Sequence, residues 1–267
     1  MSPHKLDVKR PFSLTSLPTD GAPFFPASKA AAKTQFRQTR DQLIELQRKL
    51  YAEGKQKLLI VFQAMDAGGK DGTIRNIFKG VNPQGVRVHS FKVPSKRELA
   101  HDFLWRVHNV VPPKGMIAVF NRSHYEDVLV VRVDNIVPES VWRPRYQHIN
   151  AFEKLLTDSG TTILKFFLHI SLDEQKKRFQ ARLDDPSKHW KFSLDDLNKR
   201  KQWPDYMQAY EEMLKETTTE YAPWYVIPAN QKWYRNLVVT QIIVDTLLAM
   251  NPQYPENEGD LSNVTIP

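Results

Sequence analysis

The chain has 267 residues and no cysteine. This absence excludes disulfide bonds, thiol catalysis and cysteine-based zinc sites, and it fits a reducing cytoplasm. The sequence also lacks an apolar run long enough to span a membrane, and its first residues contain no apolar signal-peptide segment. We therefore expect a cytoplasmic protein that has no membrane partner.

Acidic residues are too few to balance the basic ones. The chain has 38 Lys and Arg against 30 Asp and Glu, which gives a net charge of +8 and a pI of about 9.5. Such a balance favours a polyanionic partner: nucleic acid, an anionic membrane or a phosphate polymer. A basic surface without such a partner would give the same charge, so charge alone does not choose between them.

The ends of the chain differ in composition from its middle. Residues 1–28 carry five prolines and little periodicity, which predicts an extended N-terminal arm that could lie over a neighbouring subunit. Residues 256–267 are polar and predict a flexible tail. Because 41% of the residues are hydrophobic, the segment between them, 29–255, can bury the core of one α/β domain.

Within this domain, short apolar segments alternate with segments of helical periodicity. This alternation predicts a doubly wound α/β domain with a mainly parallel five-stranded sheet. We expect strands at 58–63, 86–91, 116–121, 162–171 and 224–227, and helices at 29–53, 96–109, 138–158 and 232–250, with a further helix after residue 70.

Residues 58–75 have the plan of a phosphate-binding loop: an apolar strand, a glycine-containing turn with a lysine, and then a helix. Backbone N–H groups at a helix N-terminus bind anions, and a lysine neutralises more of the negative charge. The alternative is a simple turn. We favour the phosphate loop because strand, lysine and helix follow in the required order.

The loop departs from the usual pattern G-x-x-x-x-G-K-[ST], in which the final hydroxyl binds magnesium. Gly69 and Lys70 are present, but Ala64 replaces the first glycine and Asp71 replaces the hydroxyl residue. A carboxylate, Asp66, lies inside the loop, where it would repel phosphates unless a cation lay between them. Asp66 is therefore a candidate magnesium ligand.

Polar residues follow the third predicted strand, at the edge where phosphate sites of parallel sheets lie. The strand ends at Asn121, which is followed by Arg122, and two carboxylates, Glu126 and Asp127, come in the next turn. These carboxylates could merely complement a helix N-terminus. Their place beside the loop favours an active-site role.

Residues 173–203 are rich in Lys and Arg, and Arg178 and Arg182 share one helix face. Phosphoryl transfer requires cations that close over the reacting phosphate and exclude water, so this segment suits a lid. Acidic residues accompany the basic ones, and a solvated charged helix would explain the composition as well. Position after the fourth strand favours the lid.

Four segments together resemble the polyphosphate kinase 2 family. Residues 63–75 are similar to its Walker A segment and residues 120–133 to its Walker B region. Residues 173–192 resemble its lid, and residues 222–234 its last strand and turn. The resemblance runs from about residue 35 to about residue 255, and four motifs in order make it specific.

The resemblance implies a P-loop kinase-like fold of the thymidylate-kinase-like type with a helical lid. It implies reversible phosphoryl transfer between inorganic polyphosphate and AMP or ADP, and also GMP or GDP, as in the subclass (class III) that uses mono- and diphosphates. It implies Mg²⁺, or Mn²⁺, and a homodimer or homotetramer. The implied catalytic residues are Asp66, Lys70, Arg122, Asp127, Arg178 and Arg182, with Asp66 and Asp127 as metal ligands. The implied substrate-binding residues are Ala67, Gly68, Gly69, Asp71, Gly72, Thr73, Asn121 and Glu126.

Two other functions compete with this interpretation. An ATP-dependent nucleoside monophosphate kinase shares the scaffold, but it predicts Ser or Thr after Lys70 and an Asp at the end of the third strand, where Asn121 stands. A basic nucleic-acid-binding protein needs clustered basic and aromatic residues without a phosphate loop. We therefore expect polyphosphate and nucleotides as partners, and no nucleic acid.

Overall fold

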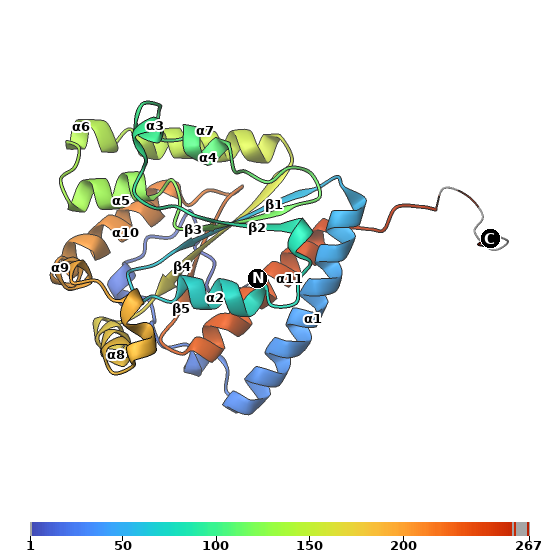
Figure 1. Cartoon of the computed structure of the whole chain (residues 1–267), viewed down its shortest axis with the longest axis horizontal. Coiled ribbons are helices and arrows are strands. Elements are labelled where there is room, and N and C mark those ends of the chain that lie inside the picture. The colour runs from blue at the N-terminus through green and yellow to red at the C-terminus, as the bar shows by residue number, and fades with distance from the viewer. Residues whose placement is uncertain (1, 258, 260–265, 267) are drawn as a thin grey trace.

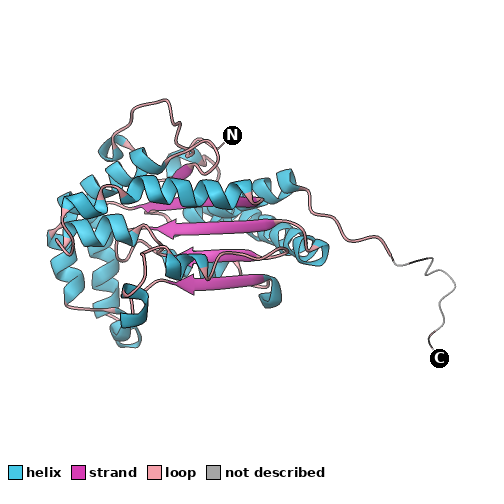
Figure 2. Cartoon of the chain, turned by 90° about the horizontal axis from the view of Figure 1, so that it is seen from above, coloured by secondary structure: helices cyan, strands magenta, loops and turns pink. Residues whose placement is uncertain are grey.

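The computed structural model describes residues 2–257, 259 and 266. Five parallel strands form one sheet in the order β2-β3-β1-β4-β5, and their arrows point the same way in Figure 2. The predicted parallel α/β sheet is confirmed. The strands are β1 (Lys57–Gln63), β2 (Val86–Ser90), β3 (Ile117–Asn121), β4 (Thr161–His169) and β5 (Trp224–Pro228).

The helices cover both faces of the sheet (Figure 1). They are α1 (Lys29–Glu53), α2 (Lys70–Ile77), α3 (Lys96–Leu99), α4 (Trp105–His108), α5 (Glu126–Val133), α6 (Glu139–Trp142), α7 (Arg145–Asp158), α8 (Leu172–Leu183), α9 (Asp195–Lys201), α10 (Trp203–Thr217) and α11 (Lys232–Met250).

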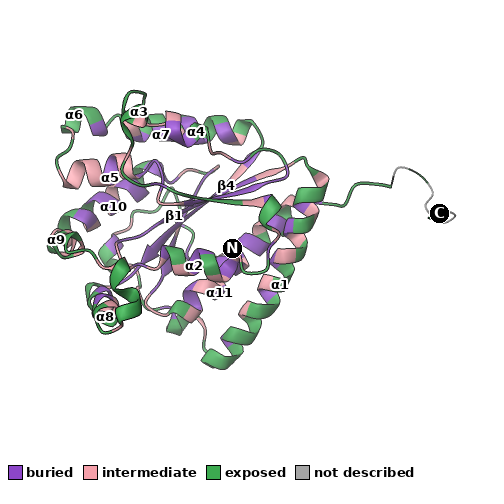
Figure 3. Cartoon of the chain, viewed as in Figure 1, coloured by how far each residue is buried: buried purple, intermediate pink, exposed green. Residues whose placement is uncertain are grey.

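The core has two halves, one on each face of the sheet. Helices α1, α2 and α11 pack on one face, where Leu43 of α1 and Ile243 of α11 are fully buried. Helices α5, α7 and α10 pack on the other face, with Ile149 and Met213 fully buried. Both faces of β1, β3, β4 and β5 are therefore largely buried, as the purple centre of Figure 3 shows, whereas the edge strand β2 is mostly exposed. This explains why β1 has a continuous apolar sequence rather than an alternating one.

Two of the expected helices are broken into shorter ones. The predicted helix 96–109 is α3 and α4, separated by a turn in which the Asp102 carboxylate accepts from the Leu104 N–H. The predicted helix 138–158 is α6 and α7, separated at Pro144, which lacks a backbone N–H. These predictions were wrong because helical periodicity continued across local breaks.

The N-terminal arm lies on its own chain rather than extending away from it. Val226 of β5 donates to the His4 carbonyl, and Leu6 donates to the Trp224 carbonyl, so residues 4–6 run antiparallel along the β5 edge. His4 Nε2 is also hydrogen-bonded to the Tyr234 hydroxyl of α11 at 2.6 Å. A proline-rich segment forms few hydrogen bonds within a helix or sheet of its own. Here the arm obtains its hydrogen bonds from β5 and α11 instead.

The sheet topology positions the candidate site. Strands β1 and β3 are neighbours, with Phe62 opposite Asn121, so the loop after β1 and the turn after β3 meet at one edge. Within the described residues, no helix is long and apolar enough to cross a membrane. Part of the predicted tail, residues 258, 260–265 and 267, lies outside the described residues.

A buried charge pair joins the sheet to the helices beside the site. Lys165 of β4 donates to the Glu153 carboxylate of α7 at 2.6 Å, to the Tyr125 hydroxyl at 2.9 Å and to the Thr217 carbonyl at 2.7 Å. Tyr125 also donates to Glu153 at 2.6 Å. The side chains of Lys165 and Glu153 are both 0% exposed. This network fixes residue 125, immediately before α5.

Replacing Lys165 with methionine is expected to lower the free energy of unfolding by about 3 kcal/mol, because Glu153 would stay buried without its partner. Urea denaturation would measure the loss. The control is the double variant with Glu153→Gln, which removes both charges and should recover much of the stability. A Lys165→Met protein as stable as the double variant would contradict a network held by the charge pair.

Candidate active site

The loop between β1 and α2 contains two residues with positive φ. Ala67 has φ of 59° although it is not glycine, and Gly69, which precedes the helix, has φ of 102°. A side chain at Gly69 would also lie 2.1 Å from a guanidinium nitrogen of Arg235. Gly69 is therefore required both by its conformation and by the close approach of a cation. Strain of this kind is found at functional sites.

Lys70, the first residue of α2, lies under the loop with 9% of its surface exposed. Its Nζ donates to the carbonyl of Ala64 at 2.6 Å, which holds the side chain back across the loop. Burial lowers the pKa of Lys70 to about 8. An anion bound in the loop would favour the charged form again, so the lysine is suited to a phosphate ligand.

Asp66 and Arg122 bring the two strand ends together. Arg122 donates to the Asp66 carboxylate at 2.9 Å, and a second guanidinium nitrogen lies 3.8 Å from the Glu126 carboxylate. Arg122 has a positive φ of 60°, which turns it back from β3 toward the loop. The predicted neighbourhood of Asp66, Arg122 and Glu126 is present, although Glu126 itself does not line the cavity described below.

Asp71 and Asn121 make a second link between the same strand ends. The Asn121 amide nitrogen donates to the Asp71 carboxylate at 2.5 Å. Asp71, which replaces the hydroxyl residue of the usual phosphate loop, is thus hydrogen-bonded to the last residue of β3. Thr73 is fully buried, and its hydroxyl donates to the Gly69 carbonyl at 2.9 Å, so its side chain faces the helix rather than the cavity.

Arg178 bonds α8, a helix of the predicted lid, to the loop. It donates to the carbonyls of Ala67 and Gly68, each at 2.9 Å, and to the carbonyls of Ala229 and Asn230 after β5. It also pairs with the Glu174 carboxylate at 2.7 Å. With 9% of its side chain exposed and these bonds made, Arg178 is placed to shape the loop. Direct contact with a reacting phosphate stays a prediction.

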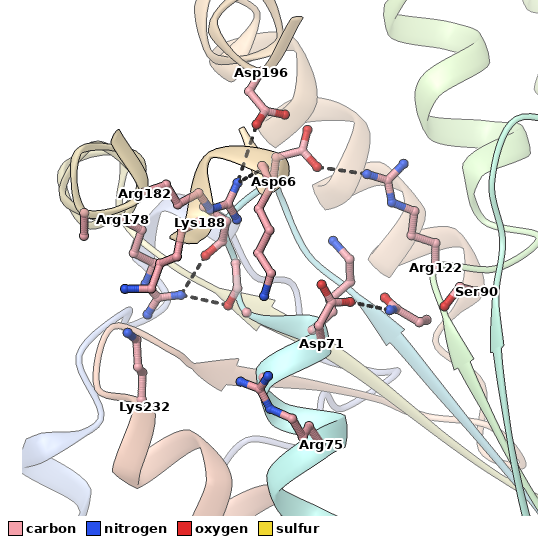
Figure 4. A pocket seen from close by; sticks show the side chains of 18 of the residues that line it. Asp66, Asp71, Arg75, Ser90, Arg122, Arg178, Arg182, Lys188, Asp196 and Lys232 are labelled. Atoms are coloured by element: carbon pink, nitrogen blue, oxygen red, sulfur yellow. Dashed lines mark hydrogen bonds and ion pairs between the residues drawn. The ribbon is translucent and has the colours of Figure 1, made fainter. Parts of the chain in front are cut away.

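Arg182 lies one helical turn further along the lid. It donates to the Lys191 carbonyl at 3.1 Å and lies 3.5 Å from the Asp196 carboxylate of α9. Figure 4 shows Arg182 and Lys188 beside Arg178 at the lid side of the pocket. Both arginines line the cavity described below, but only Arg178 is bonded to the loop, and a catalytic role for Arg182 stays a prediction.

Asp127 does not join this group. Its carboxylate lies 3.2 Å from Arg145 and 3.9 Å from Arg106, and it does not line the cavity. Burial raises the pKa of Asp127 to about 6. Arg106 in turn donates to the carbonyl of Lys92, a residue of the cavity wall. The predicted metal role of Asp127 therefore has no support from its position.

The loop, the end of β3, the lid and the start of α11 surround an open cavity of about 840 Å³ (Figure 4). Three of the residues that line it are Asp, whereas eleven are Lys or Arg, so the wall carries an excess of positive charge. The basic residues are Lys70, Arg75, Lys92, Arg122, Lys177, Arg178, Arg182, Lys188, Lys191, Lys232 and Arg235.

Arg235 of α11 is the functional candidate that sequence reasoning missed. It is 2% exposed, and one guanidinium nitrogen lies 3.5 Å from the Gly68 carbonyl. Burial, followed by repulsion from Arg178, lowers the pKa of Arg235 to about 9. One feature of the sequence could have pointed to Arg235. It lies in the first turn of α11, which carries no acidic residue, and such a helix N-terminus favours a bound anion.

The residues of the loop fit a magnesium ion that binds together with phosphates. Among the described residues, no three His, Cys, Asp or Glu side chains are grouped closely enough to hold a metal ion. Mg²⁺ does not need such a cage, because it is commonly held by one or two carboxylates, substrate phosphates and water. Asp66 supplies one carboxylate, 26% exposed, at the cavity wall.

Comparisons with known proteins agree with this geometry. The family model described as polyphosphate kinase 2 (PPK2) matches residues 26–255. The chain is 55% identical over 266 residues to the AMP/ADP-polyphosphate phosphotransferase of Meiothermus ruber, and the match covers 100% of both chains. It is 48% identical over 251 residues to the ADP-polyphosphate phosphotransferase of Rhodopseudomonas palustris, covering 90% of this chain and 86% of the relative.

A solved structure is similar over nearly the whole chain. The polyphosphate kinase 2 of Arthrobacter aurescens TC1 superposes with a TM-score of 0.93 at 44% identity, covering 97% of this chain and 92% of that one. Sequence and fold similarity therefore extend over the same region, including the loop, the lid and the turn after β5.

Proposed function

The chain belongs to the polyphosphate kinase 2 family, and from that premise we propose that it transfers phosphoryl groups reversibly between inorganic polyphosphate and nucleotides. In the forward direction it converts AMP to ADP and ADP to ATP, and it acts in the same way on GMP and GDP. The observation that carries this proposal is the cavity beside Lys70, whose wall has eleven cations and three carboxylates. Two phosphorylated substrates together supply the opposite charge.

The reaction needs no nucleophilic side chain. A terminal phosphate oxygen of the acceptor attacks the terminal phosphorus of polyphosphate in line, while the bond from that phosphorus to its bridging oxygen breaks. The products are the extended nucleotide and a polyphosphate shorter by one unit, which keeps the electron pair of the broken bond. Catalysis then consists of positioning and of stabilising negative charge.

The chain's own residues perform these tasks. Lys70 and Arg122 stabilise the charge on the oxygens of the transferred group, and Arg182 approaches from the lid. Arg178 and Arg235 hold the backbone of the loop by their contacts to its carbonyls. Asp66 would hold Mg²⁺, or Mn²⁺, with phosphate oxygens as the other ligands. The metal would neutralise phosphate charge as it develops.

For Asp127 we propose a positioning role. Its pairs with Arg145 and Arg106 hold the N-terminus of α5 against the wall near Lys92. We propose in addition a homodimer or homotetramer, which rests on the family resemblance, and a cytoplasmic location, which rests on the lack of cysteine.

With highly purified AMP as the only nucleotide, polyphosphate and magnesium, ADP is expected within the first minutes of reaction. The reason is Glu126, which resembles the residue of the subclass that accepts monophosphates and which lies 3.8 Å from Arg122. A carboxylate near the empty place of the β-phosphate can position the shorter substrate. Chromatographic separation of AMP, ADP and ATP over time gives the measurement.

The control is the variant Glu126→Gln, which keeps the shape of the side chain and removes its charge. Its kcat/KM for AMP is expected to fall more than its kcat/KM for ADP. No ADP from AMP, together with rapid phosphorylation of added ADP, would restrict the activity to diphosphates. Phosphorylation of AMP by ATP but not by polyphosphate would instead favour an ATP-dependent nucleoside monophosphate kinase.

A further inference from the structure

A second cavity, of about 800 Å³, lies between the N-terminal half of α1, the end of α2 and the start of α11. Helices α1 and α11 lie side by side in Figure 1. We call this cavity the α1 groove. Its cationic lining residues are Lys29, Lys33, Arg37, Arg40, Lys79 and Lys232. No Asp or Glu is found among the described residues that line it.

The cations of α1 are arranged as a stripe. Lys29, Lys33 and Arg37 are spaced four residues apart, and Arg40 follows after three, so they occupy one face of the helix. At 1.5 Å per residue the stripe is roughly 16 Å long. Like charges at this spacing destabilise a helix, and cations near its N-terminus oppose the helix dipole. An anion along the stripe would offset both costs.

These cations are not neutralised by acidic residues within the described part of the chain. Across the part of the chain that the structure describes, none of the six cations is within ion-pair distance of a carboxylate. Arg40 stacks over the ring of Phe36, and its Nε is buried without a hydrogen-bond partner among the described residues. A buried donor ordinarily has an acceptor, so Arg40 Nε is an unsatisfied donor in the groove. The other five cations are exposed and free to meet a ligand that enters from solvent.

The groove is continuous with the catalytic cavity. Asn76, Lys232 and Asn236 line both of them. Arg178 and Arg235 also line the catalytic cavity near Lys232, so cations are concentrated at this junction. Burial, followed by repulsion from these two arginines, lowers the pKa of Lys232. A linear anion that leaves the cavity past Lys232 would meet the stripe on α1 directly.

We propose that the α1 groove binds the part of a polyphosphate chain that lies beyond the reacting phosphates. The inference rests on the proposed function and adds to it a subsite used by long chains. A short chain is held within the catalytic cavity, whereas a long chain extends past Lys232 and along α1. The groove should therefore increase the affinity for long polyphosphate chains without taking part in the transfer step.

The test is the triple variant Lys33→Gln, Arg37→Gln and Arg40→Gln, since glutamine keeps a good helix propensity. KM and kcat are measured with long-chain polyphosphate and with the shortest chain that serves as a donor for the unaltered protein. For the long chain we expect KM to rise roughly tenfold, the effect of removing several modest charge contacts. Its KM should also depend less steeply on salt. For the shortest chain, kcat and KM should stay unchanged.

The matched control is Arg48→Gln, Lys49→Gln and Lys55→Gln, which removes the same charge from the other end of α1 and the residues after it. It should leave KM for both donors as it was, and thermal melting should show that both triple variants are folded. Equal KM changes in the two triple variants, or equal effects on both chain lengths, would contradict binding of long chains in the α1 groove. The proposed polyphosphate activity itself would not be affected by that result.

Two other outcomes are also decisive. If the unaltered protein uses neither donor, the proposed function fails rather than the groove alone. If single-stranded DNA binds the unaltered protein, and the groove variant loses that binding while its KM for long polyphosphate stays the same, the groove is a nucleic-acid site and the inference is wrong.

Discussion

Replacing Asp66 with asparagine is expected to lower turnover by roughly a thousandfold, because a metal that neutralises phosphate charge supplies several kcal/mol of transition-state stabilisation. Asp66 is the carboxylate of the loop that faces Arg122 at the cavity wall. The amide keeps the size of the side chain but is a poor ligand for a hard cation. The measurement is kcat as a function of magnesium concentration.

The carboxylate at the other end of the loop provides the control. Asp71 lines the same cavity but is bonded to Asn121, so Asp71→Asn should need little more magnesium than the unaltered protein. Binding of Mn²⁺ in the presence of ADP, followed by electron paramagnetic resonance, should weaken in Asp66→Asn alone. Near-normal turnover of Asp66→Asn at limiting magnesium would contradict the role of Asp66 as a magnesium ligand.

The second large effect is expected for Lys70→Met, which should lower kcat by a factor of roughly 10²–10³. One preorganised charge contact to a transition state is typically worth about 3–4 kcal/mol. Lys70 is preorganised by burial and by its bond to the Ala64 carbonyl, so it needs no rearrangement when charge develops. Methionine occupies a similar volume and removes the charge.

Stability and activity should respond differently to this change. Burial disfavours the charged form of Lys70 and lowers its pKa to about 8, so the free protein should not depend on this charge for folding. We expect the melting temperature of Lys70→Met to be unchanged or higher. A change confined to KM, with kcat intact, would show that Lys70 binds ground state and transition state equally, contrary to this role.

The architecture was predictable where local signals and packing agreed. The bounds of α1 and α11 match the expected 29–53 and 232–250. Ser28 caps α1 by accepting from the Ala31 N–H, and Gly54 ends it with a left-handed φ of 65°. By contrast, α10 was not assigned, although Tyr206, Tyr210 and Met213 form a buried face at helical spacing.

The site was predictable in its parts but not in their mutual contacts. The phosphate loop is continuous in sequence, so Asp66 and Lys70 could be identified from order alone. Glu126 and Asp127 are adjacent, yet consecutive helical positions point roughly 100° apart, and only Glu126 faces Arg122. Arg235 could not be placed in the site by spacing, because its contact to Gly68 joins residues 167 positions apart.

The contacts of the N-terminal arm have a consequence for the order in which the chain folds. His4 contacts Tyr234, 230 positions later, and the Leu14 N–H donates to Glu211, 197 positions later. Residues of the arm thus acquire partners that are synthesised much later than the arm itself. Closing so long a loop costs conformational entropy, so we expect these contacts to form late, after the sheet has formed. Changes in the arm should therefore accelerate unfolding far more than they slow folding, which makes the arm a determinant of the lifetime of the folded state.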